Sequence, residues 1–298
     1  MRMHVPVKHH RRVVGSLVAV IIVLLGLVGV LAKKTTPISP PEPATTYLQN
    51  EEVVIIAPQD GGKEPSVPTV LPVEKVLFEY IEVTDGCDPN FNGGCLNVRS
   101  GPGEDFSVVA RLRTGMVLKV GGKVERDGRA WYKIVFDEWL RYPQRVSADW
   151  YVSADYVEIL FDEGDRNLVG KATSTQKIII DRSEQKLYAY YGDELFMETL
   201  ISTGIELTPT PRGAFTIFKK TPSRYMQGPI PGISAKEYDL PGVPWDIYFT
   251  KEGAAIHGTY WHENFGTRAS NGCVNLPLEA ARKLYEWAEL GARVIVRD

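Results

Sequence analysis

A histidine and a cysteine near the carboxyl end of the chain have the types and the spacing for acyl-transfer chemistry. His257 precedes Cys273 by sixteen residues. An imidazole can accept the proton of a thiol, and the thiolate is the attacking form of cysteine. Alternatively, the two groups could rest as an ion pair in which the pKa of the thiol is depressed. Gly272, directly before Cys273, permits a tight turn there.

The three cysteines divide into a close pair and a single residue. Cys87 and Cys95 flank the loop DPNFNGG, and Cys273 stands alone. In an exported chain, this pattern favours a disulfide between the first two and a free thiol at the third. A metal clip is the alternative for the pair, but no nearby His or further Cys completes four ligands. Nucleophilic catalysis gives a reason to keep an unpaired thiol outside the cytoplasm.

A zinc site is a competing use of the same residues. His262 follows His257 by five positions, and both could join Cys273 around a metal ion. The spacing matches neither an i, i+4 helical pair nor a Cys-x-x-Cys clip, so we expect no metal. His262 is then a surface or groove residue. Other side chains that could line a substrate groove, with ordinary loop packing as the alternative, are Tyr260, Trp261 and Arg268.

The residues around the pair predict a β-rich domain with one packed helix. Strand-like runs occupy residues 177–181, 186–191, 194–202, 214–219, 243–250, 253–256 and 293–296. The helix follows Cys273, since Pro277 suits its first turn and Gly291 suits the position after its end. The residues that share its apolar face are Ala281, Leu284, Tyr285 and Ala288.

Several motifs of this region occur in the same order in one enzyme family. The run SNGC at 270–273, preceded by His257, resembles the signature of YkuD-type L,D-transpeptidases. Residues 179–190 are similar to the opening hairpin of that family, and STG at 202–204 and TPRGAF at 210–215 are similar to its next markers. The resemblance covers about residues 176–297 and predicts a catalytic domain at 176–298.

The resemblance implies a role for each matching residue. Cys273 is the acylated nucleophile, His257 donates and accepts its proton, and the backbone carbonyl of Gly258 orients the imidazole. The N–H groups of Asn271, Gly272 and Cys273 form the oxyanion hole. Many relatives carry His at position 271 and Arg at position 275. Here, both positions hold Asn. The side chain of Asn271 is then a tuning group and not an essential one, and Asn275 is a candidate substrate contact that lacks the arginine for recognising a carboxylate.

The reaction that the resemblance implies is cysteine-dependent acyl transfer in peptidoglycan biosynthesis. Cys273 attacks the carbonyl of the third residue of a tetrapeptide stem, usually meso-diaminopimelate, and the terminal D-Ala leaves. An amine of a second stem then resolves the thioester and forms a 3→3 cross-link, which serves cell-wall biogenesis and cell shape. If water resolves the thioester, the enzyme is a hydrolase, an L,D-carboxypeptidase. The chain gives no sign of a required cofactor.

Residues 76–160 predict a second, smaller β domain. Short β-like runs are separated by Gly-rich and Asp-Gly turns without a helical period, which favours a small barrel. The runs LNVRSGPG at 96–103 and WYVSADYV at 150–157 resemble bacterial SH3-like domains, which bind or position against the cell wall. A plain spacer is the alternative. An insertion at 138–147, EWLRYPQRVS, lengthens the loop before Trp150, and the sequence assigns it no function.

The N-terminal region predicts a membrane anchor and a tether. Residues 13–32 are uncharged and apolar, and twenty such residues can span a bilayer as a helix. More basic residues precede this run than follow it, which places the tail 1–12 in the cytoplasm and the catalytic domain outside. A cleaved signal peptide is the alternative. Residues 33–75 hold eight of the 20 prolines, which favours an extended linker.

Length and charge fit this domain organisation. A chain of 298 residues accommodates about two domains. The net charge of −3 and the lack of a basic domain argue against nucleic acid as a partner. The expected fold class is therefore mainly β: a transmembrane helix, an SH3-like β-barrel, then the β-rich L,D-transpeptidase domain. The expected partners are peptidoglycan stem peptides, the cell wall through the SH3-like domain, and the cytoplasmic membrane through residues 13–32.

Three other classes of protein compete with this interpretation. A papain-like peptidase places its cysteine before its histidine, which is the reverse of the order here. A sortase has the order found here, but a much wider spacing. A non-catalytic wall-binding anchor would act through the SH3-like domain and carry a degenerate transpeptidase domain. The intact pair of His257 and Cys273 argues against that anchor.

Overall fold

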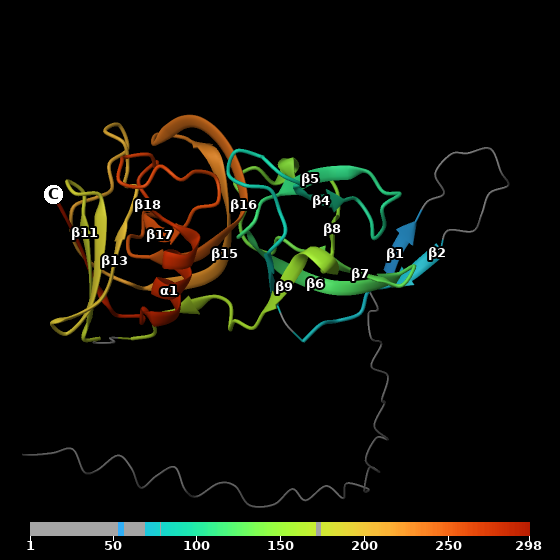
Figure 1. Cartoon of the computed structure of the whole chain (residues 1–298), viewed down its shortest axis with the longest axis horizontal. Helices are drawn as coiled ribbons and strands as arrows, with labels where there is room; N and C mark the ends of the chain where they lie inside the picture. Colours follow the sequence, from blue (N-terminus) through green and yellow to red (C-terminus); the bar gives the residue numbers. More distant parts are fainter. Residues whose placement is uncertain (1–52, 57–68, 78, 171–173) are drawn as a thin grey trace, which may run out of the picture. The chain divides into compact units, whose positions relative to one another are not determined.

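The computed structural model describes residues 53–56, 69–77, 79–170 and 174–298 (Figure 1). The cytoplasmic tail and the transmembrane helix predicted at 1–12 and 13–32 lie outside these residues. Within the described part of the chain, no helix combines the length and the apolar character that a membrane span needs. The described part of the expected linker contains two antiparallel strands, β1 (Val53–Ile56) and β2 (Thr69–Pro72).

The middle domain is a seven-stranded sheet in the order β5-β4-β8-β7-β6-β3-β9. Its strands are β3 (Tyr80–Val83), β4 (Leu96–Arg99), β5 (Val108–Leu112), β6 (Val117–Arg126), β7 (Arg129–Ile134), β8 (Trp150–Ser153) and β9 (Val157–Leu160). Two 3-10 turns, η1 (Pro143–Arg145) and η2 (Ala154–Tyr156), flank β8. Asp127 and Gly128 both have positive φ, which suits the tight hairpin between β6 and β7.

A disulfide between Cys87 and Cys95 closes the loop before β4, with an S–S distance of 2.14 Å. The carboxylate of Asp88 accepts hydrogen bonds from the backbone N–H groups of Asn90 and Asn92, both at 2.8 Å. Side-chain bonds of this kind replace the backbone pairing that a loop lacks. The loop is therefore fixed at both of its ends and from within.

The C-terminal domain contains two five-stranded sheets, ordered β10-β15-β16-β17-β18 and β13-β12-β11-β19-β14. Their strands are β10 (Arg166–Asn167), β11 (Gln176–Asp181), β12 (Lys186–Tyr191), β13 (Glu194–Leu200), β14 (Gly213–Thr216), β15 (Lys219–Ile230), β16 (Ser234–Tyr248), β17 (Ala255–Gly258), β18 (Val274–Leu276) and β19 (Arg293–Arg297). The prediction of a mainly β chain with one packed helix is confirmed for the described residues.

The long hairpin of β15 and β16 is the largest departure from the predicted strands. The sequence predicts a strand only at 243–250, whereas β16 begins at Ser234 and pairs with β15 as far as Ile230. Prolines at 222, 229, 231, 241 and 244 obscure the strand pattern, because proline cannot donate to a ladder. Register shifts after Arg224 and Gly228 accommodate the irregular stretches.

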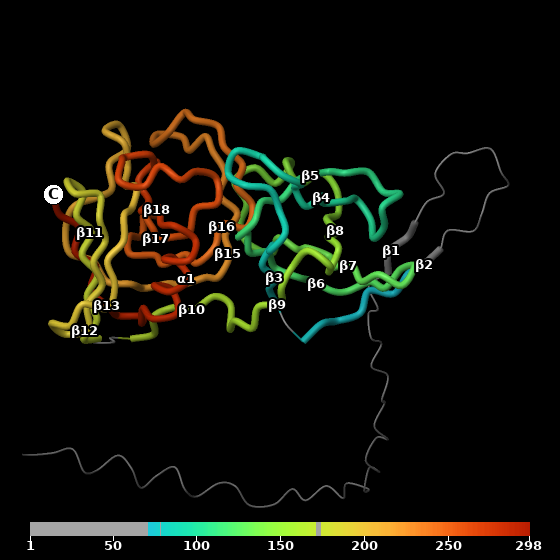
Figure 2. Tube along the Cα trace, viewed as in Figure 1, coloured from blue at the N-terminus to red at the C-terminus, as the bar shows by residue number. Residues whose placement is uncertain are grey.

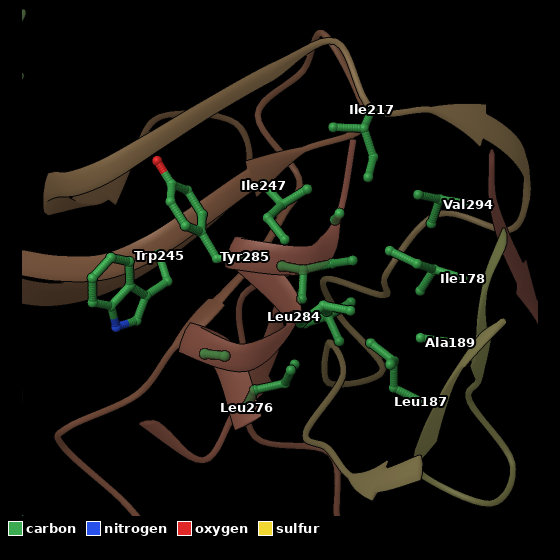
Figure 3. Close-up of a cluster of buried hydrophobic side chains, with 14 of the residues drawn as sticks. Ile178, Leu187, Ala189, Ile217, Trp245, Ile247, Leu276, Leu284, Tyr285 and Val294 are labelled. Atoms are coloured by element: carbon green, nitrogen blue, oxygen red, sulfur yellow. The ribbon is translucent and has the colours of Figure 1, made fainter. Parts of the chain in front are cut away.

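The one α-helix of the described residues, α1 (Leu278–Trp287), packs between the two sheets. Figure 3 shows Leu284 and Tyr285 on the helix among side chains of both sheets. The predicted apolar face is confirmed, since Ala281, Leu284, Tyr285 and Ala288 are all at most 2% exposed. The helix ends at Trp287, earlier than the predicted stop at Gly291, whose φ of 92° instead turns the chain into β19.

A buried lysine closes the carboxyl end of α1. Lys220 Nζ donates to the backbone carbonyls of Tyr285 and Ala288 at 2.5 and 2.6 Å. A positive charge at this end of a helix complements the helix dipole. Burial, followed by the nearby charge of Arg166, lowers the pKa of Lys220 to about 8. The polar position in β15 is thus explained by its contact with the helix.

The middle and C-terminal domains belong to one compact unit and share apolar contacts. Val243 and Tyr260 are buried in the same cluster as Leu118 of β6, and β6 contacts both β15 and β16, whose traces can be followed in Figure 2. Two glycines with positive φ permit this approach. A Cβ on Gly115 would lie 2.3 Å from Leu278, and one on Gly242 would lie 2.7 Å from the Val117 carbonyl oxygen.

Substitution of Leu284 tests the role of the helix in the core. Leu284→Ala leaves a cavity between the two sheets and should lower the free energy of unfolding by about 3 kcal/mol. Denaturant unfolding of the full chain measures this loss. The matched control is Leu207→Ala, since Leu207 is 89% exposed and should give a change within about 0.5 kcal/mol. Equal effects of the two substitutions would contradict the assigned core.

Candidate active site

The site lies on one face of β16, β17 and β18. Ile247 pairs with Ile256, which pairs with Val274, and all three side chains face the apolar core. Because side chains alternate between the two faces of a strand, the neighbouring positions face the opposite way. His257 pairs with Asn275 in one row of that opposite face. Cys273 directly precedes Val274, just as Ala255 directly precedes Ile256, so the parallel register of β17 and β18 brings Cys273 beside Ala255.

The imidazole of His257 is held in one tautomer. Its Nδ1 lies 2.9 Å from the backbone oxygen of Gly258, and the residue is 1% exposed. A carbonyl oxygen can only accept, so Nδ1 carries the proton and Nε2 keeps its lone pair. The histidine therefore presents a proton acceptor on the face of the sheet that carries Cys273.

The loop that carries Cys273 is fixed by hydroxyl groups. Ser270 Oγ and Thr210 Oγ1 both donate to the Cys273 carbonyl oxygen, at 2.5 and 3.3 Å. Ser270 Oγ also accepts from the Gly272 N–H at 3.1 Å. Gly272 has a φ of 114°, which a residue with a side chain adopts only with strain. The loop is attached to the segment after β13 through the bridge between Gly204 and Ser270.

The pair rests in its neutral form. Burial is the main cause that lowers the pKa of His257 to about 4, against the hydrogen bond to Gly258. Burial also raises the pKa of the Cys273 thiol to about 11, against a hydrogen bond from the Ala255 N–H. Since a buried site disfavours each charged form, the thiol and the imidazole are both neutral at pH 7. Of the two resting forms that the sequence allows, this environment favours the neutral one.

The four residues expected to contact substrate lie in different environments. Tyr260 is not available to a substrate, because it is 3% exposed and its hydroxyl donates to the Pro241 carbonyl at 2.6 Å. Trp261 is half-buried, with its ring centre 5.8 Å from that of His257. Arg268 is exposed. Asn275 is 2% exposed, and its amide lies 2.8 Å from His262 Nε2.

Asp246 lies on the same sheet face, although the sequence did not single it out. The register of β16 and β17 places it opposite His257, on the same face. It is 0% exposed, and neither carboxyl oxygen has a hydrogen-bond partner among the described residues. Burial raises its pKa well above the usual value, with Arg224 acting in the opposite direction. A charged residue within the apolar run VPWDIYF was the available signal in the sequence.

No metal centre is found in the described residues. Nowhere among them do three or more His, Cys, Asp or Glu side chains gather as metal ligands would. His262 makes two contacts of another kind, since its Nδ1 accepts from the Asn264 N–H at 3.2 Å and its Nε2 faces Asn275. His262 thus supports the loop between β17 and β18.

Two family models match the chain. Residues 175–296 match the L,D-transpeptidase catalytic domain named YkuD, and residues 94–158 match the bacterial SH3 domain. The protein YqjB of Bacillus subtilis, which is named as an L,D-transpeptidase, is 27% identical over 137 residues. That match covers 44% of this chain and 70% of YqjB.

Solved structures of L,D-transpeptidases are also similar. The enzyme of Mycobacterium smegmatis is 20% identical with a TM-score of 0.40, and the match covers 57% of this chain and 91% of that one. The enzyme of Enterococcus faecium is 26% identical with a TM-score of 0.38, and the match covers 42% of this chain and 50% of that one.

The pH dependence of thiol alkylation tests the neutral resting pair. With a thiol pKa of about 11, the rate at which iodoacetamide modifies Cys273 should rise steadily from pH 7 to pH 10. The modified residue is identified by mass spectrometry after proteolysis. A rate that is already constant between pH 5 and pH 8 would instead reveal a thiolate–imidazolium pair.

Asp246→Asn tests the buried carboxyl. In the folded state the Asp246 carboxyl stays protonated at pH values where the same carboxyl in the unfolded chain, with a pKa of about 3.9, has lost its proton. Stability therefore falls as the pH rises above this value. Asp246→Asn removes that loss, so the stability of the variant relative to the native chain should increase between pH 4 and pH 8.

Urea unfolding at several pH values measures this difference. Asp193→Asn is the control, since Asp193 lies exposed in the turn between β12 and β13. The assignment of a neutral buried carboxyl fails if the two substitutions show the same pH dependence.

Proposed function

We propose that this chain, which carries an L,D-transpeptidase catalytic domain and a bacterial SH3 domain, cross-links peptidoglycan stems through a thioester on Cys273. The observation that carries the proposal is the geometry on β17 and β18. There, a histidine in a fixed tautomer shares one sheet face with a half-buried, unpaired thiol. Such a pair suits acyl transfer by a cysteine nucleophile.

In the first half of the reaction, the Cys273 sulfur attacks the carbonyl carbon of the third stem residue. His257 Nε2 takes the thiol proton as the S–C bond forms. Because the resting pKa values of the two groups are about 11 and about 4, a free thiolate is costly, and proton transfer accompanies the attack. The tetrahedral intermediate collapses, and His257 returns the proton to the nitrogen of the departing D-Ala.

Backbone N–H groups of the loop that contains Cys273 stabilise the oxyanion of the tetrahedral intermediate. The Gly272 N–H donates to Ser270 Oγ, so the donors that remain from the expected set are those of Asn271 and Cys273. Two donors suffice for an oxyanion hole of the kind used in acyl transfer. The positive φ of Gly272 makes the tight turn in which these N–H groups lie.

The second half reverses the first with a new amine. The amine of another stem attacks the thioester carbonyl and transfers its proton to His257. The C–S bond breaks, and the sulfur recovers the proton as a thiol. The product is an amide between two third-position residues, a 3→3 cross-link.

The two matched domains also bear on location and partners. A cell-wall enzyme domain suggests an extracellular location, and the SH3 domain suggests attachment to the wall. The apolar run 13–32 supports the further proposal that the chain is anchored in the cytoplasmic membrane with its N-terminus inside.

Turnover of a disaccharide-tetrapeptide tests the function. The native chain should form a dimer that lacks one D-Ala, as identified by mass spectrometry. Cys273→Ala should abolish this product, and His257→Ala should slow it by about 10²–10⁴-fold, because the general base is lost.

The control is Cys273→Ala at the same protein concentration, with folding confirmed by circular dichroism. Release of D-Ala with a tripeptide as the sole product would replace the transpeptidase by a carboxypeptidase. Equal dimer formation by the native chain and the Cys273→Ala variant would refute the proposed nucleophile.

A further inference from the structure

The insertion in the SH3 domain, residues 138–147, contacts the hairpin that reaches the active site. We propose that this SH3 insertion loop is a wall of the active site. It holds β15 and β16 against the catalytic centre, and it offers Arg141 to a carboxylate of the donor stem. The inference rests on the proposed function for the identity of that stem.

The first anchor of the loop is Glu138. Its carboxylate accepts hydrogen bonds from the guanidinium of Arg224, at 2.5 Å, and from the backbone N–H of Tyr225, at 2.7 Å. The two charged side chains are 23% and 26% exposed, so water screens the pair only in part. Glu138 thus fixes the middle of β15 through both a side chain and the backbone.

Tyr142 is the second anchor. Its backbone N–H donates to Gln227 Oε1 at 2.8 Å, and its carbonyl accepts from Gln227 Nε2 at 3.2 Å. Its hydroxyl donates to the Pro229 carbonyl at 2.8 Å. Gln227 is 5% exposed, and its Oε1 would lose the Tyr142 N–H if the loop moved away, whereas its Nε2 would keep a bond to Asp239 Oδ1 at 3.2 Å. The loop therefore supplies the partners that this part of the hairpin requires.

Arg145 is the third anchor and contacts the other strand. Its guanidinium donates to the Tyr238 carbonyl at 3.0 Å and to Asp239 Oδ1 at 3.4 Å, and it stacks 4.3 Å from the ring centre of Tyr142. Asp239 also accepts from the Tyr225 hydroxyl at 2.9 Å. The three anchors together hold β15 and β16 to the SH3 domain.

The same hairpin reaches the catalytic loop. Ser234, at the start of β16, donates its hydroxyl to the Asn271 side-chain oxygen at 3.3 Å. The Tyr238 hydroxyl lies within electrostatic reach of both the thiol and the insertion loop. Burial and then Cys273 raise its pKa to about 12, and the charge of Arg141 lowers it. The backbone carbonyl of Tyr238 is bonded to Arg145 of the loop, so Tyr238 connects the loop to β16.

Arg141 is one of the two arginines of the SH3 insertion loop. Among the described residues, it has no ion-pair or hydrogen-bond partner, and its guanidinium carbon lies 5.2 Å from the centre of the Trp139 ring. The neighbouring Arg145 is, by contrast, paired with Asp239. A guanidinium binds a carboxylate through two parallel hydrogen bonds. In the proposed reaction the donor stem carries carboxylates close to the carbonyl that reacts, and Arg141 would bind one of them.

Binding of the donor to the inactive full chain tests Arg141. In a Cys273→Ala background, calorimetry measures the Kd of a tetrapeptide stem. Arg141→Gln should raise this Kd at least tenfold, and Arg141→Lys should raise it less. The matched control is Arg111→Gln, which removes an exposed arginine from β5 of the same domain and should leave the Kd unchanged.

A stem whose carboxylates are amidated should bind the parent and the Arg141→Gln protein equally. An unchanged Kd in Arg141→Gln, or equal losses in Arg141→Gln and Arg111→Gln, overturns the role of Arg141.

Shielding of the thiol tests the anchors independently of any substrate. Tyr142→Phe removes the bond to Pro229 and should increase the alkylation rate of Cys273 several-fold, with the unfolding midpoint unchanged. Tyr156→Phe, at an exposed tyrosine of the same domain, is the control and should alkylate at the native rate. An unchanged rate in Tyr142→Phe overturns the positioning role.

These two measurements separate the inference from the proposed function. If the chain binds the stem through Arg141 but forms no product, the transpeptidase proposal is contradicted and the role of the SH3 insertion loop is supported. If the chain forms dimers and Arg141→Gln binds the stem with an unchanged Kd, the transpeptidase proposal is supported and the role of Arg141 is contradicted.

Discussion

The register of three strands is the constraint on which the site depends. Ile247, Ile256 and Val274 must face the core together, and this requirement fixes how β16, β17 and β18 pair. A slip of one residue would turn His257 toward the core and expose apolar side chains. The hydrophobic effect, acting on one face of the sheet, therefore positions the chemistry on the other. The helix α1 and the second sheet complete the core that enforces this pairing.

The electrostatics of the site follow from the same burial. Burial keeps both the thiol and the imidazole neutral, so the site holds no thiolate at rest. Charge would form only when a substrate arrives with a carbonyl to receive the sulfur. The neutral carboxyl of Asp246 fits this environment, because an ionised form would oppose a thiolate nearby. Backbone groups, rather than a carboxylate, orient His257.

Features that depend only on neighbouring residues could be predicted from the sequence. The apolar face of α1 follows from the helical period, and His257 and Cys273 stand out through their types and spacing. The hairpin of β15 and β16 could not be predicted in this way, because its prolines interrupt the strand pattern and its pairing contains two register shifts. Asp246 and the contacts of the SH3 insertion loop depend on which segments meet in space. The residues next to Glu138 and Tyr142 in the sequence do not predict that Arg224 and Gln227 are their hydrogen-bond partners.

The central claim is that the chain acts through an acyl-enzyme on Cys273. The direct measurement is the intact mass of the full chain, quenched in acid seconds after mixing with a tetrapeptide stem whose own amines are acylated, so that no acceptor amine is present. We predict a mass gain equal to the mass of the donor less the mass of free D-Ala, because the thiol hydrogen leaves on the D-Ala amine, and we expect this gain on the peptide that contains Cys273. Release of D-Ala without any adduct on that peptide, or an adduct on another residue, would contradict it.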